Sequence, residues 1–245
     1  MPRGNGTATK AAKGSGPSKA GPPEPTLAPG AKRRFQQRLL KWYREHGRDL
    51  PWRRTTDPYK ILVSEVMLQQ TQVDRVIPKY HEFLERYPTF KDLANAPPDE
   101  VRRTWYPLGY NIRPHRLHSI ACEAVAKYGG TLPKGQKELL SLKGIGRYTA
   151  GAIRSFAFNE NAPILDTNVM RVLYRVFITH GEPSKLKRRL WNLSESLIPK
   201  GKCYDFNQAL MDFGATVCTA RDPYCLLCPM KDFCKTYPFD GTSKA

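Results

Sequence analysis

Four cysteines close to the carboxyl end of the chain have a spacing that could hold a metal. Cys218, Cys225, Cys228 and Cys234 form the pattern C-x6-C-x2-C-x5-C. Soft thiolate ligands favour zinc or an iron–sulfur cluster. A zinc ribbon normally has two C-x2-C knuckles, whereas this pattern has one. The spacing therefore predicts a four-thiolate metal site and leaves the metal open.

Glu65 is a carboxylate in an unusually apolar setting. The run from Tyr59 to Leu68 around it is apolar on nearly all sides, which is typical of a buried helix. Burial disfavours the charged form of a carboxylate and raises its pKa, which suits a general acid. The alternative is a structural role, in which Glu65 pairs with an arginine.

Helical patterns dominate the chain and must position these residues. From Ala31 onward, apolar residues recur at steps of three and four, and Asp57-Pro58 is typical of an N-cap and first helical residue. Because no convincing alternating strand is present, we predict an all-α fold. Cys122 and Cys203 are predicted to be buried, inert thiols. Further helical patterns lie at about 71–86, 98–107, 114–127, 135–142, 147–157, 168–179, 184–197 and 204–216.

The charge balance points to a polyanionic partner. Lys and Arg number 40 against 22 Asp and Glu, a formal net charge of +18. Residues 1–30 are rich in Gly, Pro, Ala, Ser and Lys without an apolar period, so we predict a disordered basic tail there. The remainder is also basic, which favours nucleic acid as the partner over a basic protein with no such partner.

Membrane and secreted proteins are not expected. No stretch approaches the about 18 apolar residues that span a bilayer. Residues 1–30 lack the apolar segment of a secretory signal. The cysteines are therefore predicted to bind a metal rather than to form disulfides.

Residues 139–153 form two short helical patterns joined by Gly144-Ile145-Gly146. Glycines allow unusual φ angles and expose the amides that begin the next helix, where backbone N–H groups can hold a DNA phosphate. A single G-x-G is usually only a turn. Asp166 follows Tyr148 by 18 residues and, taken alone, is typical of an N-cap.

The hairpin, Asp166 and the cysteine pattern together resemble the helix–hairpin–helix DNA glycosylase superfamily, which includes endonuclease III. The resemblance implies two all-α modules, with double-stranded DNA and a flipped base in the cleft between them. A six-helix barrel is expected at residues 58–167, with the hairpin at about 136–157. A discontinuous module, residues 31–57 and 168–245, is implied to carry one [4Fe–4S] cluster on the four cysteines.

The resemblance is strongest to the adenine DNA glycosylase branch and covers about residues 35–235. The chain ends at Ala245, so we expect it to lack the C-terminal domain that helps this branch to recognise 8-oxoguanine. The sequence departs from the branch at Ile61-Leu62, at Asn111 and at Thr167. The motifs that carry the resemblance are Leu50-Pro51-Trp52-Arg53, Asp57-Pro58-Tyr59-Lys60, Ser64-Glu65-Val66-Met67-Leu68-Gln69-Gln70-Thr71-Gln72-Val73, Leu93-Ala94-Asn95-Ala96-Pro97, Leu108-Gly109-Tyr110 and Pro163-Ile164-Leu165-Asp166-Thr167-Asn168-Val169.

The resemblance gives two carboxylates complementary roles. Breaking an N-glycosidic bond develops oxocarbenium character on the sugar while the purine needs a proton, and carboxylates on opposite sides of the bond serve both needs. Glu65 is implied to protonate adenine N7, and Asp166 to stabilise the sugar. Tyr148 stands where bifunctional relatives have a lysine. A phenol cannot form the Schiff base that leads to strand cleavage, so we predict a monofunctional enzyme.

Excision from a duplex also requires that the base be flipped out and its partner held. The residues implied to contact the opposite guanine are Gln70, Thr71, Leu108 and Tyr110. Those implied to line the adenine pocket are Arg48, Leu50, Trp52, Arg53 and Gln208. The hairpin residues expected at a DNA phosphate are Lys143, Gly144 and Gly146. We further hypothesise phosphate contacts at Arg113, Arg116 and Arg221.

The sequence thus predicts a monomeric, monofunctional DNA glycosylase of base excision repair, acting on adenine opposite guanine or 8-oxoguanine. One alternative is a thymine/uracil glycosylase at G·T and G·U pairs, which draws on Tyr148, on the expected lack of the C-terminal domain and on the departures near Ile61 and Asn111. Another is a non-catalytic DNA-damage binder, against which Glu65 and Asp166 argue. We expect the protein in the nucleoid of a prokaryotic cytoplasm or in a eukaryotic nucleus.

Overall fold

The computed structural model describes residues 30–178, 180–239 and 241. Within this part of the chain the regular structure is helical and contains no strand, as the sequence predicts. The predicted disordered tail lies outside the described residues, except for Gly30. The first seven helical elements are α1 (Ala31–His46), the 3-10 turn η1 (Pro51–Arg53), α2 (Pro58–Met67), α3 (Val73–Arg86), α4 (Phe90–Asn95), α5 (Pro98–Trp105) and α6 (Ile112–Tyr128).

The second half of the chain continues the helical pattern. The helix α4 had no counterpart among the predicted patterns, and it begins at a capping box formed by Thr89 and Asp92. Cys203 is buried as predicted, but Cys122 is exposed on α6, so its prediction was wrong. The remaining elements are α7 (Gln136–Ser141), α8 (Arg147–Phe156), α9 (Thr167–Phe177), α10 (Lys187–Leu197), α11 (Cys203–Thr216) and the 3-10 turn η2 (Cys225–Leu227).

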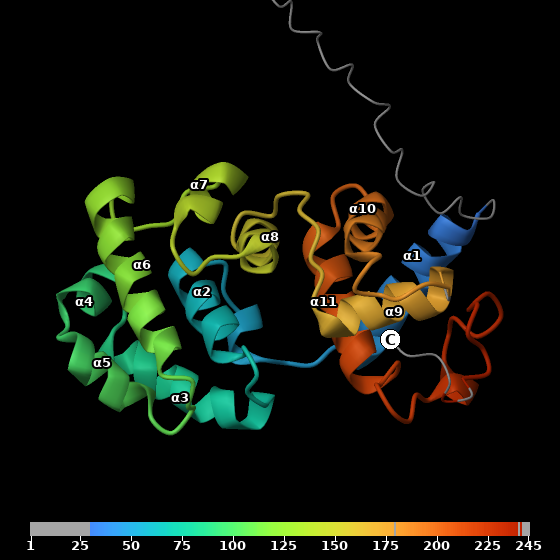
Figure 1. The fold of residues 1–245 in the computed structure, drawn as a ribbon, viewed down its shortest axis with the longest axis horizontal. Helices are drawn as coiled ribbons and strands as arrows, with labels where there is room; N and C mark the ends of the chain where they lie inside the picture. Colours follow the sequence, from blue (N-terminus) through green and yellow to red (C-terminus); the bar gives the residue numbers. More distant parts are fainter. Residues whose placement is uncertain (1–29, 179, 240, 242–245) are drawn as a thin grey trace, which may run out of the picture.

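The helices form two lobes, and each lobe has its own hydrophobic core (Figure 1). Helices α2 to α7 make the lobe drawn in cyan and green, while α1 and α9 to α11 make the other. Helix α2 serves both cores, because Ile61 packs in one and Leu62 in the other. Helix α8 does the same through Ala152 and Ile153. The fold is therefore all-α with two modules; the predicted module boundaries remain predictions.

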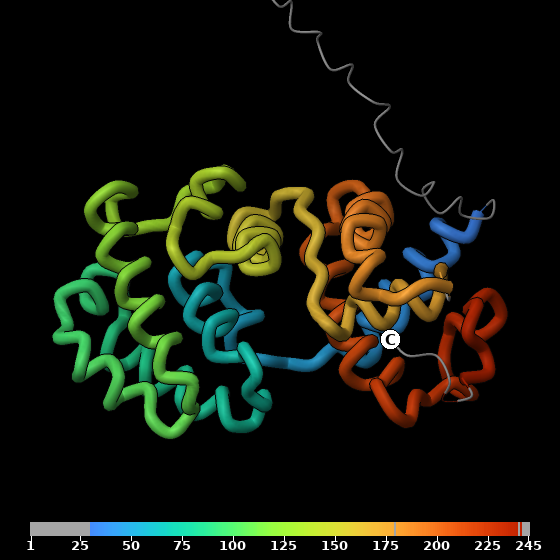
Figure 2. The backbone as a smooth tube through the Cα atoms, viewed as in Figure 1, coloured from blue at the N-terminus to red at the C-terminus, as the bar shows by residue number. Residues whose placement is uncertain are grey.

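The chain crosses between the lobes twice. It enters the lobe of α2 through the segment after α1, and it returns through the segment between α8 and α9 (Figure 2). As a result α1 packs against α11, near the other end of the chain. Both crossing segments carry predicted site residues, so the topology brings their side chains to the junction of the lobes. No helix in the described part is long and apolar enough to span a membrane.

Candidate active site

Helix α2 holds Glu65 at the wall of a cavity of about 580 Å³. The helix begins where Asp57 Oδ1 accepts a 2.8 Å hydrogen bond from the Tyr59 backbone N–H, with Pro58 as its first residue. Seven of its neighbours in α2 are buried with Glu65, whose exposed fraction is 5%. The residues that line the cavity are Arg48, Leu50, Trp52, Arg53, Glu65, Leu68, Gln69, Gln70, Thr71, Val73, Tyr148, Asp166, Thr167, Asn168, Met211 and Ala215.

Burial raises the pKa of Glu65 to about 7. Within this balance a hydrogen bond with Tyr148 acts to lower the pKa, the negative charge of Asp166 acts to raise it, and the positive charge of Arg53 acts to lower it. Glu65 therefore retains its proton over a substantial fraction of the time near neutral pH. A carboxylic acid of this kind can donate a proton to a leaving group that lies in the cavity.

Asp166 lies on the same cavity and also caps α9. Its Oδ1 accepts a 2.7 Å hydrogen bond from the Val169 backbone N–H, and its Oδ2 accepts one of 3.3 Å from the Asn168 side chain. Burial raises the pKa of Asp166, and these hydrogen bonds, together with the charge of Arg171, oppose the rise. Asp166 therefore caps α9, as the sequence suggests, and also lines the cavity.

Tyr148, the second residue of α8, is the third predicted catalytic residue on this cavity. Burial, followed by the negative charges of Glu65 and Asp166, raises the pKa of its phenol well above the usual value. Tyr148 Oη lies 3.8 Å from Met211 Sδ, and the phenol also forms a hydrogen bond with Glu65. Tyr148 is therefore a neutral phenol at every physiological pH.

The structure brings nine of the predicted residues to this cavity and leaves others elsewhere. Gln208 is buried with an exposed fraction of 4% but is not among the lining residues. Leu108 is buried in the core of the α2 lobe, and Tyr110 is exposed with a left-handed φ of 48°. Trp52 is both a core residue and part of the wall. The predicted residues on the wall are Arg48, Leu50, Trp52, Arg53, Glu65, Gln70, Thr71, Tyr148 and Asp166.

Arg113 is not a surface cation, so its hypothesised phosphate contact was wrong. Its side chain is buried, and its guanidinium stacks near the rings of Trp105 and Tyr110. The two terminal nitrogens connect the end of α2 with the loop before α6. Their acceptors are the carbonyl oxygens of Val66, Met67, Gln69, Leu108 and Gly109 and the hydroxyl of Thr71.

The hairpin joins α7 to α8 as the sequence predicts. Gly144 has a φ of 115°, and a Cβ at that position would lie 3.2 Å from the Arg116 side chain. Gly146 is the N-cap of α8 and provides no side-chain cap, so the first amides of the helix have no side-chain acceptor there. Lys143 is exposed beside them. This surface has the features of an anion-binding helix start.

Comparison with known proteins finds a family model over the part of the chain that contains the hairpin, Glu65 and Asp166. The model of the HhH-GPD superfamily base excision DNA repair proteins matches residues 63–196. The chain belongs to this superfamily.

Adenine and thymine glycosylases are both among the relatives of this superfamily member. The chain is 43% identical to the adenine DNA glycosylase of Homo sapiens. The match covers 82% of the chain but only 39% of the human protein. The chain is 37% identical to the thymine/uracil-DNA glycosylase of Methanothermobacter thermautotrophicus, over 83% of its own length and 93% of that protein. A solved thermostable thymine-DNA glycosylase is 36% identical, with a TM-score of 0.80 over 85% of this chain and 97% of that one.

Sequence reasoning did not single out Asp212 on α11, which lies behind the cavity wall. Its side chain is completely buried and binds both Arg48 and Arg53, which line the cavity. The only sequence signal is a charged residue between Met211 and Phe213 in an otherwise apolar stretch. That signal does not indicate which cation the carboxylate meets.

The four cysteines of the predicted metal site surround a second, small cavity of about 20 Å³. Arg175 lies beside them, with Nη1 3.7 Å from Cys218 Sγ, and Arg171 donates to the Cys218 carbonyl at 2.8 Å. Among the described residues, no group of three or more His, Cys, Asp or Glu side chains has the arrangement of a metal site as it stands.

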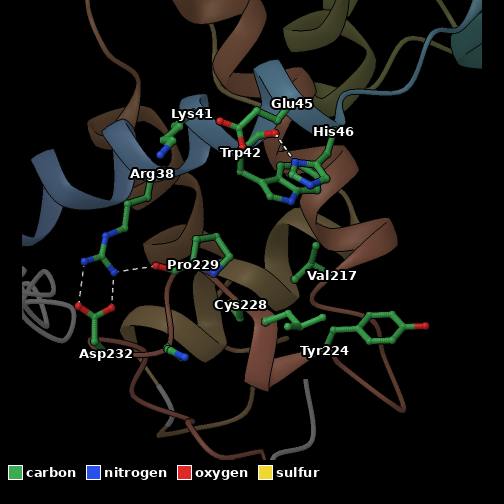
Figure 3. A pocket seen from close by; sticks show the side chains of 12 residues that line it. Arg38, Lys41, Trp42, Glu45, His46, Val217, Tyr224, Cys228, Pro229 and Asp232 are labelled. Atoms are coloured by element: carbon green, nitrogen blue, oxygen red, sulfur yellow. Dashed lines mark hydrogen bonds and ion pairs between the residues drawn. The ribbon is translucent and has the colours of Figure 1, made fainter.

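A larger cavity, of about 820 Å³, lies elsewhere (Figure 3). It lies between α1 and the segment that carries the four cysteines, with Trp42 and His46 on one side and Tyr224 on another. Arg38 reaches across to Asp232 and to the Pro229 carbonyl. None of the predicted catalytic residues lines it. Volume alone therefore does not identify the site, whereas paired carboxylates on one wall do.

Proposed function

We propose that the chain is a monofunctional DNA glycosylase of base excision repair that removes adenine mispaired with guanine or 8-oxoguanine. One observation carries this proposal: Glu65 and Asp166 line one cavity, and burial raises the pKa of Glu65 to about 7. The 43% identity to an adenine DNA glycosylase supports adenine as the base. The proposed substrate is double-stranded DNA. We expect the protein to bind it as a monomer, in the nucleoid of a prokaryote or in a eukaryotic nucleus.

The proposed reaction divides the work between two carboxyl groups. Glu65 donates its proton to N7 of the flipped adenine, so that the base leaves as a neutral molecule when the N-glycosidic bond breaks. The carboxylate of Asp166 stabilises the positive charge that develops on the deoxyribose. Water then adds to C1′ and gives a proton to the Glu65 carboxylate, which restores the acid and leaves an abasic site. Tyr148 provides no amine, so the DNA strand stays intact.

A second candidate is excision of thymine or uracil opposite guanine. The chain matches nearly the whole length of a thymine/uracil-DNA glycosylase and of a solved thymine-DNA glycosylase. Both candidates use the same cavity and differ in the base that it accepts.

Duplexes that contain A·G, A·8-oxoguanine, T·G or U·G separate these candidates. After incubation with the protein, each duplex is analysed with and without hot alkali. We expect alkali-dependent breaks at adenine and intact strands without alkali. Breaks only at T·G and U·G would reject adenine as the base, and breaks without alkali would reject a monofunctional enzyme. Binding without any excision would instead favour a DNA-damage binder.

We infer that the four cysteines hold one [4Fe–4S] cluster. Four soft thiol donors around one enclosed cavity fit such a group, and Arg171 and Arg175 supply positive charge beside Cys218. Cys218, Cys225, Cys228 and Cys234 would be its ligands. When bound, the cluster would contribute to folding and to docking on DNA rather than to bond breaking.

The metal content of the purified protein tests this inference. We expect about four iron and four sulfide per chain, with a brown colour and absorbance near about 400 nm. Cys228→Ser should lower the iron content severalfold, whereas Cys122→Ser, a change at an exposed thiol, should leave it unchanged. One zinc per chain and no iron would overturn the cluster.

A further inference from the structure

Asp212 is the single carboxylate that holds two arginines of the cavity wall. Its Oδ2 accepts hydrogen bonds from the Arg48 backbone N–H at 2.9 Å and from Arg53 Nη1 at 2.7 Å. Its Oδ1 accepts from Arg48 Nε and Arg53 Nη2, both at 2.7 Å. The Asp212 side chain is fully buried. A buried carboxylate with four charge-assisted or backbone hydrogen bonds fixes its donors in position.

These contacts decide which parts of the two arginines remain for a ligand. The side chain of Arg53 is 7% exposed, with both terminal nitrogens on Asp212 and Nη1 also on the Arg48 carbonyl at 2.9 Å. Its buried Nε has no hydrogen-bond partner. The Arg48 side chain is 31% exposed and faces the cavity. Asp212 thus orients both guanidinium groups without itself lining the cavity.

We propose that Asp212 is the positioning residue of the base pocket, an inference that rests on the proposed function. Asp212 holds Arg48 and Arg53 in place and offsets their positive charge beside Glu65. Burial acts to raise the pKa of Asp212, but Arg53 and Arg48 outweigh it and hold that pKa below its usual value. Asp212 is therefore an anion at neutral pH.

The charge balance around Glu65 gives this arrangement a measurable consequence. Three groups face Glu65 from neighbouring elements: Tyr148 of α8, Asp166 before α9, and Arg53 of η1. Of these, Arg53 carries the one positive charge, and it lowers the pKa of Glu65. When Asp212 loses its charge, Arg53 is no longer neutralised, so Glu65 should lose its proton at a lower pH.

The other groups packed around Asp212 do not replace its charge. Tyr43 of α1 and Tyr204 of α11 flank Arg53, and burial raises the pKa of both phenols. Asp205 of α11 also acts on these tyrosines but is exposed. Among the described residues around Arg48 and Arg53, Asp212 is thus the carboxylate that binds both guanidinium groups.

The variant Asp212→Asn tests the proposal, because it keeps the size of the side chain and removes the charge. Single-turnover excision of adenine is measured from pH 5 to 9, together with the Kd for the duplex. Wild-type excision should decline above about pH 7, where Glu65 loses its proton. In Asp212→Asn this decline should move to lower pH by about one unit, so the rate at pH 8 falls about tenfold more than at pH 5.

Asp205→Asn is the matched control, an acid-to-amide change on the exposed side of the same helix. It should leave the pH profile unchanged. The carboxyl ¹³C signal of Glu65, assigned by its loss in Glu65→Gln, should titrate at lower pH in Asp212→Asn. If Asp212→Asn does not fold, Asp212→Glu restores the charge, and we expect it to keep the wild-type pH profile while weakening binding through displaced arginines.

An Asp212→Asn profile that coincides with the wild type, in a folded protein, would overturn the proposal. So would an Asp212→Glu profile displaced to lower pH. These results differ from failure of the proposed function, in which the wild-type protein itself excises no adenine. If thymine is excised instead, the same profiles are measured on the T·G duplex.

Discussion

Glu65→Gln should lower the rate of base excision by about 10²- to 10⁴-fold, which is the usual contribution of a general acid. Glutamine has the size of glutamic acid and similar helix propensity, so α2 should form as before. It cannot give up a proton at any pH near neutral. The raised pKa of Glu65, about 7, is what makes the native side chain an acid there. Single-turnover excision of adenine from an A·G duplex measures the effect.

Glu85→Gln is the control for Glu65→Gln, because Glu85 is an exposed glutamate on α3 away from the cavity. We expect it to have the wild-type rate. The Kd of Glu65→Gln for the same duplex should remain within severalfold of the wild type, since Glu65 is uncharged for much of the time. A rate within threefold of the wild type would remove the acid role. A loss of binding as large as the loss of rate would point to a damaged fold.

The helices were predictable because their apolar residues recur at helical steps, and such local signals survive in the folded chain. Helix α4 lacked this signal: it is only six residues long, and its start is marked by the capping box of Thr89 and Asp92 rather than by periodicity. The prediction that Cys122 is buried was wrong for a related reason. Its presence in a helical pattern did not tell which face of α6 the thiol occupies.

The site was predictable where the chemistry depends on neighbours in sequence. The apolar run around Glu65 indicated burial, and the raised pKa followed from it. Arg113 could not be placed in the same way, because most of its acceptors are backbone carbonyls, the farthest of them 47 residues away. Asp212 and Arg53 are 159 residues apart and meet only because α11 packs beside the segment after α1. Long-range pairing of this kind leaves no periodic or spacing signal.

Asp166→Asn should lower the rate of excision by about 10²- to 10³-fold, the range observed when one electrostatic contact to a transition state is lost. The substitution separates the two roles that Asp166 has in the structure. The amide oxygen of asparagine can still accept the Val169 N–H bond, and asparagine is as good an N-cap as aspartate, so α9 should begin at the same residue. What is lost is the negative charge beside the sugar. Single-turnover rates and thermal unfolding of the same preparations measure the two roles independently.

Asp57→Asn provides a matched control for Asp166→Asn, because the Asp57 side chain also caps a helix, α2, but does not line the cavity. Both variants should unfold within a few degrees of the wild type, and only Asp166→Asn should be slow. The charge of Asp166 also raises the pKa of Glu65, so its removal should shift the decline of excision to lower pH. Equal rates for the two variants would mean that Asp166 is a helix cap alone. An asparagine side chain has one acceptor oxygen, so Asp166→Asn keeps the bond from Val169 and loses the one from the Asn168 side chain. A large fall in the unfolding temperature of Asp166→Asn would mean that the bond from Asn168 is essential to the fold.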